Sequence, residues 1–128
     1  ASFLGPMKSS MSPYPLQVTR NRITKEEAKP HFLLPTHALL NSPNKITEKD
    51  FEDWIQERSI YTAETPDTHF EFPLGFSDPN ESENKGNIAV TKYGKGQFIY
   101  TGLVFFREIP AGVPGAYRLL ANLLAKPN

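Results

Sequence analysis

Arg107 and Glu108 form a charged pair directly after the apolar run FIYTGLVFF, a position that favours chemistry. In open α/β sheets, ligands bind beyond the carboxyl ends of strands, so a functional pair is expected there. The nearby loop PAGVPG could bring backbone amides close to a ligand. The alternative interpretation is a buried pair that anchors this loop and the segment after it. The sequence leaves both interpretations open.

The stretch DWIQERSIY places Trp54 close to two charged residues, Glu57 and Arg58. An aromatic ring beside charged groups suits sugar recognition, because the apolar faces of sugars stack on rings. Tyr100, within the apolar run, is a further ligand-binding candidate. Phe51 and Trp54 have helical spacing, which favours the alternative: Trp54 fills the core and the two charges lie at a helix end.

His37 lies in the loop PTHALLNSPNK, where it could be a base, a ligand or a polar anchor. No second histidine follows four residues later, and the chain has no HxH or HExxH spacing, so no metal site is predicted. Zero cysteines exclude a thiol nucleophile and disulfides. Asp78 opens the acidic turn DPNESENKG, which lacks calcium-loop spacing and is predicted to be exposed.

The charge balance of the chain limits its partners. Its 14 basic and 14 acidic residues cancel, and the basic face that nucleic-acid binding needs is not expected. No apolar run approaches the ~20 residues that span a bilayer. Neither nucleic acid nor a membrane span is therefore predicted.

Residues 93–125 predict the elements that would position Arg107 and Glu108. Gly94 and Gly96 suit a tight reversal between strands over residues 87–93 and 97–103. The second strand is β-branched and aromatic, as in strands covered on both faces. Pro114 suits a first helical turn, and an apolar stripe should pack the helix at residues 114–125 on that strand. The stripe comprises Ala116, Leu119, Leu120, Leu123 and Leu124.

Weaker signals precede this unit. Thr47, followed by Glu48 and Asp50, predicts the start of a helix that continues through Arg58. Thr24 and Glu27 fit a capping box. Short strands are expected at residues 16–19, 32–34, 59–62 and 70–76. Residues 1–15 read as an irregular N-terminal segment or a cloning remnant, and residues 16–128 as a single α/β domain that is the C-terminal part of a larger one.

Two stretches carry a family resemblance: HALLNSPNKITEKDFEDWIQERSIY and YGKGQFIYTGLVFFREIPAGVPGAYRLLANLLA. They resemble the C-terminal region of large bacterial LmbE/PIG-L-type deacetylase proteins. There a segment similar to class I glutamine amidotransferases, close to the ThuA-like group, follows a deacetylase domain. The resemblance implies a partial amidotransferase-like (flavodoxin-like) layered α/β sheet with a C-terminal β-hairpin and closing helix. It also implies an extracytoplasmic location, periplasmic or secreted.

The departures from that family bear on activity. The HPDD-like zinc motif of the deacetylases is absent, and so are the nucleophilic cysteine and His-x-Glu pair of the amidotransferases. His37 falls in a loop similar to the His-Pro loop of ThuA-like domains, but Ala38 replaces the proline. Neither catalytic apparatus carries over, and no cofactor is expected.

Three functions remain open. The first is a non-catalytic accessory or carbohydrate-associated module, with the deacetylase domain of the parent protein and a carbohydrate as partners. The second is a ThuA-like enzyme domain acting on a sugar-derived substrate, with His37, Glu57, Arg107 and Glu108 converging in one pocket. The third is a structural or oligomerisation segment, because part of a sheet exposes an edge.

Overall fold

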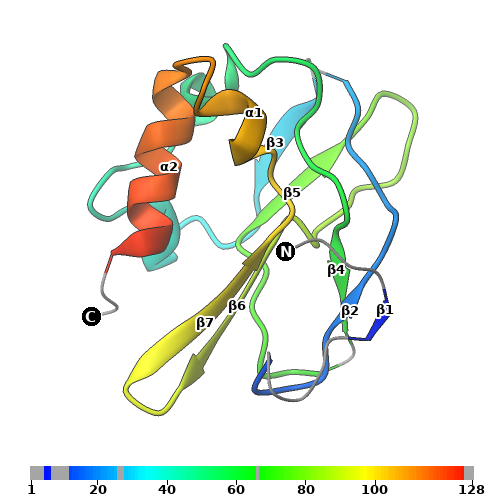
Figure 1. Ribbon diagram of the computed structural model, residues 1–128, viewed down its shortest axis with the longest axis vertical. Coiled ribbons are helices and arrows are strands. Elements are labelled where there is room, and N and C mark those ends of the chain that lie inside the picture. The colour runs from blue at the N-terminus through cyan, green and yellow to red at the C-terminus, as the bar shows by residue number, and fades with distance from the viewer. Residues whose placement is uncertain (1–4, 7–11, 26–27, 66, 126–128) are drawn as a thin grey trace.

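The computed structural model describes residues 5–6, 12–25, 28–65 and 67–125, which form small antiparallel sheets and a C-terminal helix (Figure 1). The first sheet has the order β1-β2-β4 and joins Gly5–Pro6, Gln17–Val18 and Ala63–Glu64. The second pairs β3 (Lys29–Phe32) with β5 (Leu74–Ser77). A mixed α/β architecture is thus confirmed, whereas a layered flavodoxin-like sheet is not, since every described strand pair is antiparallel.

The predicted hairpin is present as β6 (Ile88–Tyr93) and β7 (Gly96–Thr101). Tyr93 pairs with Gly96, so only two residues make the turn, and Gly94 adopts a φ of 60° that other residues resist. Residues 88–90 of β6 are buried, but β7 is half-buried along most of its length. The expectation that this second strand is covered on both faces is therefore wrong.

The closing helix α2 (Pro114–Leu124) begins at the predicted proline. Ala116 and Leu119 are fully buried, whereas Leu120 is half-buried and Leu124 is 77% exposed, so the apolar stripe is narrower than predicted. The helix lies chiefly against two 3-10 turns, η1 (Ala38–Leu40) and η2 (Glu48–Phe51), and not against β7 as expected.

Gly115 permits this close packing of α2 on η2. A Cβ added at Gly115 would lie 1.7 Å from the carbonyl oxygen of Asp50. No side chain fits at that distance, so only glycine lets the two backbones approach so closely.

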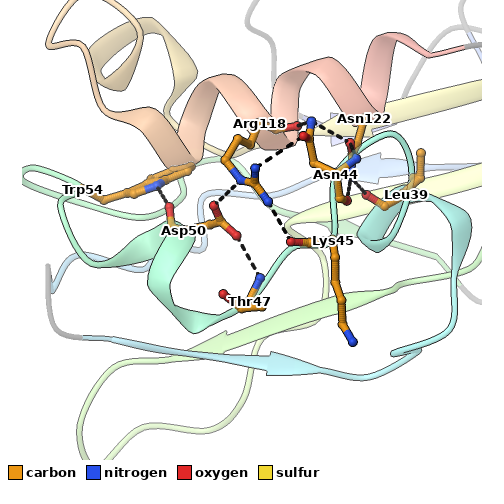
Figure 2. Close-up of polar contacts among 8 residues, drawn as sticks. All are labelled: Leu39, Asn44, Lys45, Thr47, Asp50, Trp54, Arg118 and Asn122. Carbon is orange, nitrogen blue, oxygen red and sulfur yellow. Dashed lines mark hydrogen bonds and ion pairs between the residues drawn. The ribbon is translucent and has the colours of Figure 1, made fainter.

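Polar side chains of α2 fix the segment between η1 and η2 (Figure 2). The Asn122 amide donates to the carbonyls of Leu39 (2.8 Å) and Asn44 (2.7 Å), and its oxygen accepts from the Asn44 N–H at 2.9 Å. Arg118 donates to the Asp50 carboxylate at 2.8 Å and to the Lys45 carbonyl at 3.0 Å. We call these six residues the α2 clamp.

The helix predicted from Thr47 ends after one 3-10 turn. Its N-terminus forms as expected, since the Thr47 N–H donates to the Asp50 carboxylate at 2.9 Å. Beyond η2 the chain turns away: Gln56 has a φ of 61°, and the Arg58 N–H donates to the Ile23 carbonyl at 2.8 Å. Pairing with a distant segment replaces the helical hydrogen bonds here.

Three other local predictions need correction or lie outside the described residues. Residues 59–62 form no strand, only two isolated bridges at Ser59, whereas Ala63 and Glu64 form β4 just after the predicted range. The prediction that Asp78 is exposed is wrong: Asp78 is 6% exposed, and its carboxylate accepts hydrogen bonds from the backbone N–H groups of Thr24 and Lys25. Residue 27 of the predicted capping box lies outside the described residues.

The main core lies between α2, the two 3-10 turns and the hairpin. It includes Leu40, Phe51, Phe76, Ile88 and Leu119. A smaller cluster is formed by Leu16, Ala63, Phe70 and Ala89. Among the described helices, none is long and apolar enough to cross a membrane.

Candidate functional site

Glu57 lies between two arginines, one on each carboxylate oxygen. Nη2 of Arg22 is 2.6 Å from Oε2, and Nε of Arg107 is 3.1 Å from Oε1. Glu57 itself is only 6% exposed, a burial that a carboxylate tolerates because it is paired. We call these three residues the Arg–Glu–Arg cluster. Two of them, Glu57 and Arg107, are sequence-predicted candidates, whereas Arg22 was missed.

Pairing between three distant segments brings the cluster together. Ile23 forms an antiparallel bridge with Ser59, and Ser59 forms another with Leu103. Arg22 precedes the first of these segments and Glu57 the second. Arg107 lies on α1 (Phe105–Glu108), which starts just after Leu103. No motif within one segment could reveal this arrangement, because its members come from three parts of the chain.

The cluster carries one net positive charge and faces solvent with its arginines. The Arg22 side chain is 54% exposed and that of Arg107 is 37% exposed. The hydrogen bond that Arg22 donates to the Glu57 carboxylate, and then the negative charge of that carboxylate, raise the pKa of Arg22 above its usual value. Part of each guanidinium remains available to water or a ligand.

Arg22 also lines an open groove of about 1380 Å³. Arg20 and Asn21 extend this wall, and Tyr14 adds an aromatic ring. Residues 12–17, 63–65 and 81–86 also line the groove, including Glu64 and other charged or amide side chains. The groove is large enough for a ligand of several sugar rings, since drug-sized pockets measure roughly 300–1,000 Å³.

The other charged candidates hold the fold together. Glu108 is fully buried, and its Oε1 accepts from the Ile55 N–H at 2.6 Å. Arg58 is 5% exposed and donates to the carbonyls of Ala28 and Phe51. Glu108 thus takes the anchoring role that the sequence left open for it, whereas Arg58 is buried and does not lie at the end of a helix as the alternative for Trp54 had it.

The aromatic candidates are enclosed to different degrees. Trp54 is 2% exposed and its indole N–H donates to the Asp50 carbonyl at 2.8 Å, so it offers no open stacking platform. Tyr100 is half-buried, and its hydroxyl donates to the Tyr61 carbonyl. Desolvation raises the pKa of Tyr100 to about 12.

His37 is bonded elsewhere. Its Nδ1 accepts from the Leu39 N–H at 3.1 Å, and its Nε2 lies 3.3 Å from the Glu71 carboxylate. Within the described part of the chain, no hydrogen bond or ion pair joins His37 to the Arg–Glu–Arg cluster or to Glu108. The four residues of the enzyme hypothesis are therefore only partly brought together.

Comparisons with known proteins add no relative. No family model, no curated protein and no solved structure matches the chain. In the described ranges, no group of three or more His, Asp or Glu side chains is arranged to hold a metal ion. The site is therefore interpreted from its own geometry.

Proposed function

We propose that this chain is a non-catalytic, carbohydrate-associated module of a bacterial PIG-L-type deacetylase protein. In this proposal the described sheets and α2 are the C-terminal part of a larger amidotransferase-like, flavodoxin-like layer. The module would lie beside the deacetylase domain outside the cytoplasm and hold a glycan near it. The family resemblance supplies the parent protein, and the bonding of the candidate residues supports the non-catalytic role.

The observation that carries this proposal is the use of the acidic candidates as structural acceptors. Both oxygens of Glu57 are paired with arginines, and Glu108 is fully buried against the Ile55 N–H. A general base needs an oxygen within reach of the proton that it removes from a substrate. Glu57 offers none without breaking its ion pairs, and Glu108 is fully buried and out of reach of a substrate.

The groove supports the association with carbohydrate. Sugar hydroxyls donate and accept hydrogen bonds, so a sugar site combines arginine and amide donors with carboxylate acceptors. Arg20, Asn21 and Glu64 line the groove together, and Asn21 already donates to Glu64 at 3.1 Å. Tyr14 also lines the groove, and one face of its ring is stacked on His69 with the centroids 3.7 Å apart.

The test compares the parent protein with a variant that lacks residues 16–128. We expect the deletion to leave turnover of a short acetylated sugar unchanged, and to lower both retention on polymeric glycan and its deacetylation. Equal retention and equal activity on both substrates would overturn the proposal and favour a purely structural role. Turnover of a sugar substrate by the chain alone, abolished by Glu57→Gln, would instead establish the enzyme hypothesis.

A further inference from the structure

The Arg–Glu–Arg cluster has the charge of a receptor for a single anion. Two guanidiniums share one carboxylate, so one positive charge is left uncompensated. Each ion pair uses only one of the several N–H donors of its guanidinium. The arginines are 54% and 37% exposed, so these remaining donors are accessible from solvent.

Glu57 also orders the two arginines before any ligand arrives. Its side chain is 8% exposed and belongs to the segment that bridges Ile23 and Leu103, so its position is fixed by the backbone pairing. Long arginine side chains lose rotamer freedom on binding, and fixing them in advance lowers that cost. Binding a ligand therefore costs the cluster less side-chain conformational entropy than it would cost two unpaired surface arginines.

The charge favours a carboxylate over a phosphate. A carboxylate neutralises the single excess charge, whereas a dianionic phosphate would reverse it. The planar guanidinium fork can bind either group with two parallel hydrogen bonds, so the charge decides between them.

The surroundings indicate what carries this carboxylate. Arg22 lines the groove, so a group bound to it would place the rest of the ligand beside Asn21 and Tyr14. On the other side, Phe106 is 60% exposed, and its ring centroid lies 5.0 Å from Cζ of Arg107. An exposed ring beside the cation suits the apolar face of a sugar.

We propose that the Arg–Glu–Arg cluster binds the carboxylate of an acidic saccharide whose remaining rings occupy the groove. This assignment rests on the carbohydrate association proposed above and narrows it to uronate-type sugars. Arg22 and Arg107 contact the carboxylate, and Glu57 acts as a positioning residue.

Calorimetric titration of the intact chain tests the assignment with three probes: an oligosaccharide with a single terminal uronate, a neutral oligosaccharide of the same length, and inorganic phosphate. The first probe carries only one carboxylate, because Glu64, Glu81 and Glu83 line the groove and would repel further ones. We expect this acidic oligosaccharide to bind most tightly and its affinity to fall with added salt, because exposed charges are screened. Arg22→Gln and Arg107→Gln should each weaken it by about tenfold or more, the loss of about one charge-assisted contact.

Two controls make the result specific. Lys95→Gln removes the same charge in the exposed hairpin turn and should leave the affinity unchanged. Arg22→Lys keeps the charge but loses the planar fork, so it should bind less tightly than wild type and more tightly than Arg22→Gln. Unchanged tryptophan emission from buried Trp54 confirms that each variant is folded.

Several outcomes would overturn the assignment. Equal affinity for the acidic and neutral oligosaccharides would show that the cluster does not select charge, and would leave the carbohydrate association intact. Phosphate binding as tightly as the acidic oligosaccharide would indicate a general anion site. Full affinity in folded Arg22→Gln would exclude the cluster, whatever the deletion experiment on the parent protein shows.

Discussion

Replacing Asn122 by leucine should strongly destabilise the chain. Asn122 is 1% exposed and makes three short hydrogen bonds, at 2.7, 2.8 and 2.9 Å, to backbone groups of Leu39 and Asn44. Leucine has a similar size but no polar atoms, so two carbonyls and one N–H would lose their partners. At about 1 kcal/mol for each unmade bond, we expect a loss of about 3 kcal/mol in the free energy of unfolding. That is a large fraction of the ~5–15 kcal/mol typical of a domain.

Urea denaturation followed by Trp54 fluorescence measures this loss, because Trp54 lies in the same region of the core. Asn122→Asp is a matched variant: it keeps the shape and one acceptor but cannot donate to the two carbonyls when ionised. At neutral pH, Asn122→Asp should be at least as unstable as Asn122→Leu. Ala121→Leu, at an exposed position of α2, should change stability by less than about 0.5 kcal/mol. A loss under about 1 kcal/mol in the free energy of unfolding of Asn122→Leu would refute the claim that the α2 clamp stabilises the fold.

Three further predictions address packing and pH. Gly115→Ala should cost about 3 kcal/mol or more by the same urea assay, because its Cβ would overlap the Asp50 carbonyl; a near-neutral effect would contradict that close approach. Leu119→Ala should lower the free energy of unfolding by roughly 2–5 kcal/mol and Leu120→Ala by clearly less, since only Leu119 is fully buried. Equal losses for the two variants would contradict the difference in burial between these leucines. Burial raises the pKa of Tyr100 to about 12, so the unfolded chain loses that proton first, and stability should fall between about pH 10 and pH 12. Urea midpoints across that range should show a steeper fall for wild type than for Tyr100→Phe, and parallel curves would argue against the shift.

The C-terminal third of the fold was predictable because local signals dominate it. Gly94 occupies a two-residue turn where positive φ is needed, and Pro114 opens α2. Both residues restrict or permit backbone angles independently of what packs on them. The hairpin and the helix therefore follow from sequence, although the surface on which the helix packs does not.

The parts that were not predicted depend on contacts between distant segments. The helix expected from Thr47 stops because Arg58 pairs with Ile23, which lies far back in the chain. Arg22 carries no local signal, since its role appears only when Ser59 bridges both Ile23 and Leu103. In the sequence, Asn122 is a polar residue beside the apolar stripe of α2. Its burial is explained only by its hydrogen bonds to the backbone of Leu39 and Asn44.

The α2 clamp also has a consequence for the order in which the chain is made. Asn122 follows its partner Leu39 by 83 residues, and Arg118 follows Asp50 by 68. A ribosome releases the N-terminal partners first, so their carbonyls and the apolar surface around Phe51 stay uncovered until α2 emerges. Such long-range closure is slow compared with local folding. During synthesis, chaperones and proteases would therefore meet this region as an exposed surface until the last helix is complete.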